Sequence, residues 1–336
     1  MKIERIRSYE KFMGVKSEWN ILLCRSGLNI PFLTHQWFDA WWSSFGGLNT
    51  MEILLFRDAS GILSGIAPLM VSEESLRFIA SHEVTDYCDF IFVPDKRDKF
   101  YDCLWDHISR NSNGWSRIEL ISIPDPSATL SELPRLAERH GYASRVNESE
   151  IVPKLPLPAS IEKYLHSLSR KNRHELRRKI RKLDTLGNIH IRKIKEAEQL
   201  QDAVDGFISL HRASSREKRE FWNSPGMTDF FHAFCRLFSL ENWVEMTVLT
   251  SSDRLIAALL SFHYAETVYF YNIAYDKDYS VYSPGFSLFH HAIDQAIADQ
   301  VKLVDFLRGR EKYKYFFGAK ESKIYSLKLK RIEKRS

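Results

Sequence analysis

The chain has 336 residues, of which 44% are hydrophobic and 13% aromatic, so it is long enough for two domains or one large domain with a sizeable core. Its 48 Lys and Arg residues against 43 Asp and Glu give a net charge of +5, and this near balance with a high apolar content excludes intrinsic disorder. The mild net charge also disfavours a general nucleic-acid binder, so an anion site must come from local clustering of cations.

The first half alternates helical and strand-like segments. Thr34 is expected to cap a helix that carries several tryptophans, and Asp58–Gly61 has the chemistry of a hairpin turn. We expect helices at 15–25, from 34 onward, at 98–110 and at 130–140, and strands at 51–56, 62–71, 76–79, 90–93 and 117–121. Mixed elements of this kind predict an α/β or α+β unit of about 150 residues.

A Pro-rich stretch follows, Val152-Pro-Lys-Leu-Pro-Leu-Pro. Proline lacks a backbone N–H group and fixes φ, so we expect this stretch to hold neither a helix nor a central strand. It is the best candidate for a boundary. We therefore predict an N-terminal domain at 1–156 and a C-terminal domain at 157–336.

The second half contains the same kinds of elements. Three consecutive strands are separated by short turns, which predicts an antiparallel meander. We expect helices from 160 onward and at 169–186, 197–213, 228–240 and 284–300, and strands at 188–193, 243–250, 254–264, 267–274, 302–307 and 322–329. The element order is similar in the two halves, so we predict a duplicated α/β module.

The cysteines and the N-terminus indicate the compartment. The four cysteines are widely spaced without a C-x-x-C motif, which disfavours a metal site, a redox motif or a disulfide scaffold and fits a reducing compartment. The first residues are charged and lack the apolar core of a signal peptide, and no apolar run approaches the ~20 residues of a membrane span. We expect a cytoplasmic protein without a membrane span.

A dense basic run lies between Arg170 and Lys182, with eight cations in thirteen residues and Glu175 as the one acid. Leucine and isoleucine at helical spacing give it a narrow apolar stripe and basic faces. A solvated surface helix is the ordinary explanation, but like charges packed this densely favour a nearby anion. We predict a phosphate-rich or otherwise anionic ligand, and a membrane surface and RNA remain open as that anion.

The segment Ser283-Pro-Gly-Phe-Ser begins a helix soon after the meander. Such an N-terminus offers free backbone N–H groups and the positive end of the helix dipole, which suit a diphosphate, although an ordinary turn gives the same pattern. The sequence has neither G-x-G-x-x-G nor a P-loop, so nucleotide chemistry of those types is disfavoured. The residues predicted to bind the ligand are Ser283, Pro284, Gly285, Phe286 and Ser287.

A polar cluster follows the strand near residue 305. Asp305 at the strand end is a candidate base, Tyr313 a proton donor and Lys314 an anion-binding group, with Arg308 beside them. His263, within the meander, is a further acid–base candidate. Each of these residues has an equally good structural explanation by itself.

Two other groups of residues are weaker candidates. Asp86 and Tyr87 in the first half would line a substrate cleft if they do not simply belong to a loop. His290, His291 and Asp294 resemble metal-ligand spacing, but adjacent helical residues point about 100° apart, so we predict no metal site there.

Several segments in order along the chain resemble the GNAT-like N-acyltransferases of the cellulose-biosynthesis (CelD-like) acetyltransferase family, which is related to the FemAB-type aminoacyltransferases. In the first half these are Pro31–Trp37, Gly65–Leu69 and Asp86–Tyr87. In the second half they are Leu168–Gly187, Ala274–Tyr279 with Ser283–Gly285, and Val304–Lys314. The resemblance covers nearly the whole chain and implies two tandem GNAT-like domains, the N-terminal one degenerate, each with a mixed, largely antiparallel sheet flanked by helices.

The resemblance also implies acyl transfer from a coenzyme A thioester, acetyl-CoA in the simplest case, to an amine of a sugar, peptide or small molecule, in exopolysaccharide or cell-envelope biosynthesis. It implies no bound cofactor, and it places the diphosphate at Ser283–Gly285. Lys314 matches a lysine of FemAB-like proteins that assists the acceptor or the developing charge. Arg173 and Arg177 match basic residues near the acceptor or carrier.

The donor and the role remain open at this level. Only Gly285 matches the R/Q-x-x-G-x-G/A loop of GNAT enzymes, so a longer acyl thioester, a carrier protein and aminoacyl-tRNA remain alternatives to acetyl-CoA. A tRNA-dependent aminoacyltransferase and a non-catalytic anion-binding module are the competing functions. The acceptor and the oligomeric state are not indicated by the sequence.

Overall fold

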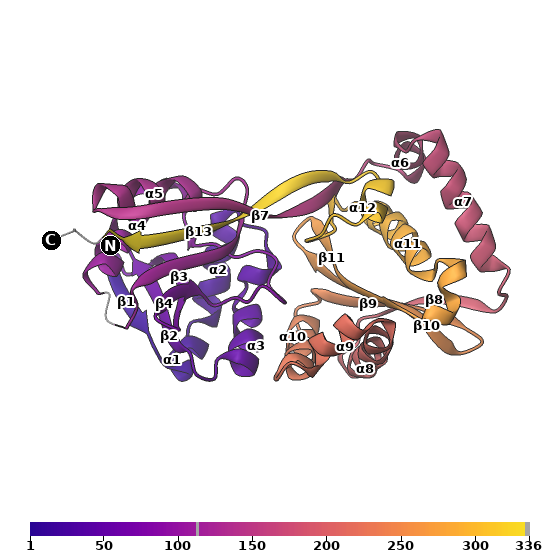
Figure 1. Ribbon diagram of the computed structural model, residues 1–336, viewed down its shortest axis with the longest axis horizontal. Helices are drawn as coiled ribbons and strands as arrows, with labels where there is room; N and C mark the ends of the chain where they lie inside the picture. The colour runs from indigo at the N-terminus through magenta and orange to yellow at the C-terminus, as the bar shows by residue number, and fades with distance from the viewer. Residues whose placement is uncertain (112–113, 333–336) are drawn as a thin grey trace. The chain divides into compact units, whose positions relative to one another are not determined.

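The computed structural model describes residues 1–111 and 114–332, which form two compact units (Figure 1). Unit 1 comprises Met1–Glu150 and the C-terminal segment from Lys323, and unit 2 comprises Ile151–Ser322. Strands β7 (Tyr142–Pro156) and β13 (Lys320–Arg331) each contribute residues to both units.

Unit 1 is a mixed sheet with helices. Its strand order is β1-β2-β3-β4-β6-β13, with β5 beside β3; β4 and β6 are parallel and the other pairs antiparallel. The strands are β1 (Lys2–Ile6), β2 (Thr50–Arg57), β3 (Leu63–Ser72), β4 (Ser75–Phe78), β5 (Ile91–Phe92) and β6 (Arg117–Pro124). The helices are α1 (Tyr9–Met13), α2 (Lys16–Ser26), α3 (His35–Phe45), α4 (Arg97–Arg110) and α5 (Thr129–Arg139).

Unit 2 has the strand order β7-β12-β11-β10-β9-β8, in which β11 and β12 are parallel and the other pairs antiparallel. The strands are β8 (Ile189–Ile194), β9 (Val244–Ser251), β10 (Arg254–Tyr264), β11 (Thr267–Tyr275) and β12 (Leu303–Asp305). The α-helices are α6 (Ile161–Ser167), α7 (Arg170–Asp184), α8 (Ala197–Ser214), α9 (Arg216–Asn223), α10 (Met227–Ser239), α11 (Pro284–Ala298) and α12 (Lys312–Phe316). The 3-10 helix η3 (Lys277–Tyr282) precedes α11.

The two units repeat one arrangement. In each, three antiparallel strands (β2-β3-β4 or β9-β10-β11) are followed by a helix, α4 or α11, and by a strand parallel to the third one. The predicted meander, the mixed and largely antiparallel sheets and the flanking helices are thereby confirmed. The predicted cap of α3 is also present, because the Thr34 side chain accepts a hydrogen bond from the Trp37 amide.

The prediction that the Pro-rich stretch holds no central strand was wrong, because β7 runs through Val152–Pro156. Residues 154–156 of β7 pair with β12. The hydrogen bonds there use the carbonyl of Pro153, which accepts from Phe306, and the amide of Leu157, which donates to Lys302. These hydrogen bonds need no N–H group from Pro153 or Pro156, so both prolines are compatible with a strand at this position.

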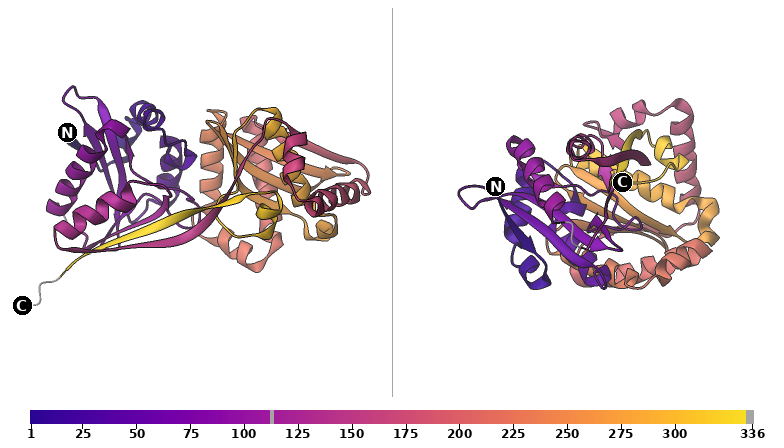
Figure 2. Two further views of the ribbon diagram at one scale, coloured as in Figure 1. Left: turned by 90° about the horizontal axis from the view of Figure 1, so that it is seen from above. Right: turned by 60° about the vertical axis from the view of Figure 1, so that its left-hand side comes forward.

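The units also differ from the predicted domains at 1–156 and 157–336. The last strand, β13, pairs over residues 324–330 with β6 of unit 1, so the C-terminal segment joins the first unit. Figure 2 shows this yellow strand beside the magenta strand β7, and in unit 1 the Ser149 hydroxyl donates to the Ile324 carbonyl. A pairing between such distant segments has no signature in the local sequence.

Helices cover both faces of the unit 2 sheet. Helices α11 and α7 lie on one face and α8, α9 and α10 on the other (Figure 1). Leu176 and Leu183 of α7 are buried against α11 and the sheet, and Ile180 packs beside them. The predicted apolar stripe of α7 therefore packs on the core of unit 2. The opposite face is aromatic; Phe262 of β10 stacks on Tyr271 of β11 with centroids 4.7 Å apart.

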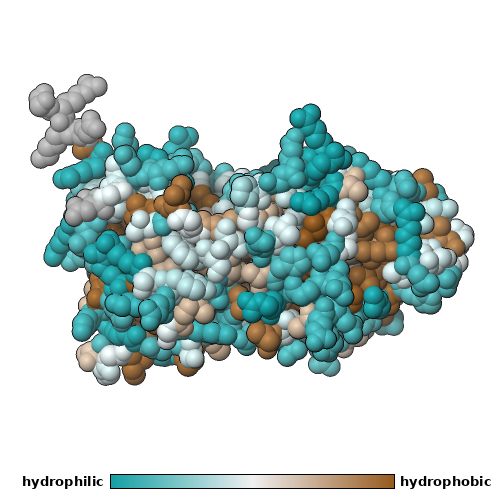
Figure 3. Space-filling model, turned by 90° about the horizontal axis from the view of Figure 1, so that it is seen from below, coloured by the Kyte–Doolittle hydropathy of each residue, from teal (hydrophilic) through white to brown (hydrophobic). Residues whose placement is uncertain are grey.

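The surface in Figure 3 is mostly hydrophilic, with small hydrophobic areas between the polar side chains. Within the described residues, no helix is both long and apolar enough to cross a membrane.

We predict that Leu176→Ala destabilises the protein by about 3 kcal/mol, because it leaves a cavity where α7 packs on the core. Urea denaturation measures the loss. The control is Lys171→Ala, which removes an exposed side chain of the same helix and is expected to change stability by less than about 0.5 kcal/mol. Equal stabilities of the two variants would show that α7 is not anchored by this stripe.

Candidate active site

The start of α11 has the backbone geometry that an anion site needs. Ser283, the N-cap residue, has φ +53°, and Pro284 occupies the first helical position. Proline at this position costs no hydrogen bond, since the first N–H groups of a helix have no partner within it. The amides of the first turn are therefore presented together with the positive end of the dipole of a 15-residue helix.

A cavity of about 280 Å³ lies at this helix start. Its lining combines polar and apolar groups: Lys179, Ser280 and Ser283 with Ile273, Tyr275, Pro284, Gly285, Phe286, Phe289 and Tyr313. Gly285 keeps one wall open, because a Cβ there would stand 3.1 Å from Ile273 and 3.5 Å from Tyr275. The cavity thus suits a ligand that is anionic at one end and slender and apolar at the other.

Lys179 is the cation of this cavity and comes from the basic helix α7. Its ammonium group donates a hydrogen bond of 2.8 Å to the Ser283 hydroxyl and lies 4.9 Å from the centre of the Phe286 ring. Glu175, one turn earlier, lies 3.9 Å away and pairs mainly with Arg178. The sequence indicated that this helix needs an anion, but it did not single out Lys179.

Tyr313 is the titratable side chain on the apolar side of the cavity. Its ring stacks on Phe289 with centroids 4.8 Å apart. Burial, with the charge of Glu311 as a smaller cause, raises the pKa of the Tyr313 hydroxyl above its usual value of 10. The hydroxyl therefore keeps its proton at neutral pH, as an exposed tyrosine also does, and the raised pKa makes it a weaker acid. Its role as a proton donor stays a prediction.

Ser287, the last residue of the predicted diphosphate-binding group, is buried in the first turns of α11. It is not among the residues that line the cavity, whereas Ser283, Pro284, Gly285 and Phe286 are.

Lys314 and Asp305 do not line the cavity. Lys314 is buried, and its ammonium group donates to the carbonyls of Leu307, Arg308 and Gly309 and pairs with Glu311 at 3.0 Å. These contacts fix the turn after β12. In this turn Arg308 takes part through its carbonyl.

Asp305 faces the other side of the sheet. Its neighbours Val304 and Phe306 belong to the core beneath α11, so Asp305, between them, points away from that core. One carboxylate oxygen accepts from the Leu307 amide at 2.8 Å, and the other lies 3.7 Å from the Lys154 ammonium group. The structure therefore does not place Asp305 beside Tyr313 as a catalytic pair.

His263 lies at the far end of β10 from the cavity. It pairs with Val268, whereas the cavity residue Ile273 pairs with Leu259, four positions along the strand, or roughly 13 Å. Its imidazole stands 3.6 Å from the buried carboxylate of Glu245. The predicted clustering of His263 with Asp305, Tyr313 and Lys314 is thus not found.

Glu245 is the centre of a second charged group. Burial raises the pKa of its carboxyl, but His263 and the ammonium groups of Lys193 and Lys195, at 3.5 and 3.3 Å, outweigh burial and hold the pKa at about 2. The sequence analysis missed this residue, because Glu245 stands within an otherwise apolar strand with no motif around it.

Arg173 and Arg177 have different environments on α7. The guanidinium group of Arg173 donates to the carbonyls of Leu165, His166 and Leu168, so it caps the C-terminal end of α6. Arg177 is exposed, and its carbonyl accepts a hydrogen bond from Arg181.

Asp86 and Tyr87 are buried in unit 1, at 6% and 2% exposure, and Tyr87 packs against Phe32. Nearby, burial raises the pKa of Asp89 to about 6, although the hydroxyls of Ser127 and Thr129 donate to its carboxylate. These residues form part of the interior of unit 1, so the structure gives them packing and hydrogen-bonding roles.

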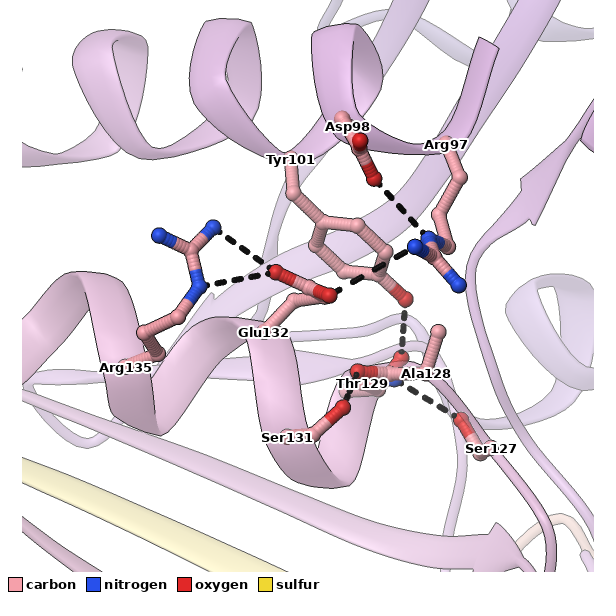
Figure 4. A network of polar contacts seen from close by, with 9 residues as sticks. All are labelled: Arg97, Asp98, Tyr101, Ser127, Ala128, Thr129, Ser131, Glu132 and Arg135. Carbon is pink, nitrogen blue, oxygen red and sulfur yellow. Dashed lines mark hydrogen bonds and ion pairs between the residues drawn. The ribbon is translucent and has the colours of Figure 1, made fainter. Parts of the chain in front are cut away.

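The start of α4, the helix of unit 1 that corresponds to α11, carries charged side chains that join a polar network with α5 (Figure 4). Arg97 pairs with Asp98 and lies 4.0 Å from Glu132, and Tyr101 bonds to Thr129. An acid in the first turn stabilises a helix but repels a phosphate, so this helix start differs chemically from that of α11.

Comparison with known proteins gives a family match within unit 2. Residues 170–315 match the family described as acetyltransferase (GNAT) domain, and no curated protein matches the chain. A conserved protein of unknown function from Bacteroides thetaiotaomicron has a similar structure at 8% identity, with a TM-score of 0.63 over 98% of this chain and 100% of that one.

Two further solved structures share the fold. FemX matches at 10% identity, TM-score 0.59, over 97% of each chain. A tandem GNAT protein from the clavulanic acid biosynthesis pathway matches at 9% identity, TM-score 0.54, over 99% of this chain and 100% of that one. The fold is therefore of the tandem GNAT type. Unit 2 carries a GNAT acetyltransferase domain, and the protein is an acyltransferase.

Among residues 1–111 and 114–332, no three His, Cys, Asp or Glu side chains are grouped so as to hold a metal ion. Enzymes of the GNAT fold use acetyl-CoA as a co-substrate and not as a bound cofactor.

We predict that Glu245→Gln lowers stability at pH 7 by about 3 kcal/mol, since the folded-state pKa of about 2 lies below the ordinary glutamate pKa of 4.5. A depressed carboxyl pKa contributes stability above pH 4.5 and loses it as the pH falls towards 2. The difference between wild type and variant in urea denaturation should thus shrink between these pH values. Glu198→Gln, at an exposed position, is the control; a pH-independent difference for Glu245→Gln would contradict the assignment.

Proposed function

We propose that unit 2 transfers an acyl group, acetyl in the simplest case, from a coenzyme A thioester to a primary amine of a sugar, peptide or small molecule. The cavity at α11 is the observation that carries this proposal. Lys179 and the first-turn amides bind the donor diphosphate, and the side formed by Ile273 and Phe289 takes the pantetheine arm.

The reaction follows from these positions. The neutral amine attacks the thioester carbonyl carbon, the C–S bond breaks, and the departing thiolate takes the proton of the Tyr313 hydroxyl. The amine gives its own proton to water, and the Tyr313 phenolate takes a proton back from water, so the tyrosine is restored. Because Asp305 faces the other side of the sheet and His263 lies near the far end of β10, we assign neither of them as the base.

The finer resemblance to the cellulose-biosynthesis type remains a hypothesis about the acceptor. It favours an amine of an exopolysaccharide or cell-envelope precursor, and a reaction in the cytoplasm, where acetyl-CoA is available. Binding and turnover with amino sugars and short peptides test this choice.

An aminoacyl-tRNA donor is the second candidate. It is favoured by the likeness to FemX and by the exposed cations of α7 beyond Lys179, among them Arg177 and Arg181. RNase treatment of a lysate distinguishes an aminoacyl-tRNA donor from a coenzyme A thioester, because it abolishes tRNA-dependent transfer and leaves thioester-dependent transfer unchanged. An anion-binding module without turnover would bind the donor but release no thiol.

We predict that Gly285→Val weakens acetyl-CoA binding at least tenfold, because the new side chain projects towards Ile273 and Tyr275 in the cavity wall. Isothermal titration calorimetry measures the affinity, and the melting temperature shows whether the variant folds. Gly141→Ala, a glycine with nothing within 4 Å of a Cβ, is the comparison for affinity. Unchanged binding by a folded Gly285→Val protein would exclude this cavity as the donor site.

We predict that Tyr313→Phe lowers kcat by about 100-fold and changes the CoA dissociation constant by less than about twofold, since it removes a proton donor and keeps the ring that stacks on Phe289. Thiol release with a panel of amines measures turnover. Tyr315→Phe, on the same helix but outside the cavity, is the control. Equal turnover of the two variants would remove Tyr313 from the mechanism.

A further inference from the structure

The cavity at α11 is too small for a whole coenzyme A molecule. Its volume of about 280 Å³ lies just below the range of roughly 300–1,000 Å³ typical of pockets that enclose a drug-sized ligand. If the pantetheine arm and the diphosphate occupy it, as the proposed function requires, the adenosine with its 3′-phosphate lies outside. The surface next to the cavity must then receive a second, dianionic group.

Lys182 stands at that surface. It follows Lys179 by three residues on α7, so the two side chains lie on the same side of the helix. Its ammonium group is 5.9 Å from the centre of the Tyr282 ring, and Tyr282 directly precedes Ser283 at the start of α11. Lys182 is exposed and α7 contacts η3, so its charge lies next to Tyr282, one residue before the cavity residue Ser283.

Other cations of α7 are less suitable. The guanidinium group of Arg173 caps α6, and that of Arg178 pairs with Glu175. Arg181, two residues beyond Lys179, points about 200° away from it around the helix. Lys182 therefore combines the required side of α7 with proximity to η3.

We propose that Lys182 binds the 3′-phosphate of the coenzyme A donor, beside Tyr282, while Lys179 binds the diphosphate. This inference rests on the proposed function and adds a specificity residue to it. The two lysines act on different phosphate groups of one ligand. Lys182 makes the enzyme select coenzyme A over a donor that lacks the 3′-phosphate, whereas Lys179 contributes equally to both.

The test is calorimetric titration of the full chain with coenzyme A and with 3′-dephospho-coenzyme A. We expect the wild-type protein to prefer coenzyme A by about fivefold, the upper range for an exposed charge pair, and Lys182→Ala to bring this ratio close to one. Lys179→Ala should weaken the binding of both ligands and leave the ratio of their affinities unchanged. Arg181→Ala, which removes an equal charge next to Lys182 on another side of α7, should also keep it.

The outcomes separate this inference from the proposed function. If wild type binds both ligands with equal affinity, or if Lys182→Ala keeps the wild-type preference, Lys182 does not read the 3′-phosphate, although the donor site stands. If the folded wild-type protein binds neither ligand, the proposed function is wrong and this inference with it. A preference lost in Arg181→Ala as well would show a general charge effect and would also overturn the inference.

Discussion

The geometry of the candidate site depends on holding the ammonium group of Lys179 beside the first turn of α11. A helix as basic as α7 repels itself, and its folded position is stabilised by burial of its few apolar residues. Leu176 and Leu183, each nearly inaccessible to solvent, contribute roughly 1.5–3 kcal/mol apiece by the usual scale for a buried leucine. The stripe thus orients the helix so that Lys179 and Ser283 meet. The same packing leaves Arg177, Arg181 and Lys182 exposed.

The two units show how one topology supports different chemistry. Helices α4 and α11 follow the third strand of a meander in the same way, but their first turns differ. Helix α4 places the ion pair of Arg97 and Asp98 there. Helix α11 begins with Pro284 and Gly285, which contribute no charge, so its amides and dipole are presented to the cavity together with Lys179. The match to the acetyltransferase domain falls on the half with the open helix start.

Local signals predicted most of the fold. The cap at Thr34, the three-strand meander and the stripe of α7 depend on neighbouring residues, so the sequence shows them directly. Short elements were missed: β1, α1 and α9 are only five to eight residues long and have weak periodicity. The strand β7 was missed for another reason. Its prolines disfavour strands in general, and only its pairing with β12 shows that their nitrogens are not needed.

The sequence by itself determined the class of fold and the helix start at Ser283–Gly285. It also predicted an anion beside α7 and Tyr313 as a proton donor, and these stay predictions. Tertiary structure decided which of the predicted polar residues meet. Residues close in sequence after β12 diverge, because alternation along the strand sends Asp305 to one face while Lys314 turns back onto three carbonyls. Lys179 and Ser283 meet although 104 residues separate them. Distances across a sheet and between helices depend on register and packing, which no local pattern of residues contains.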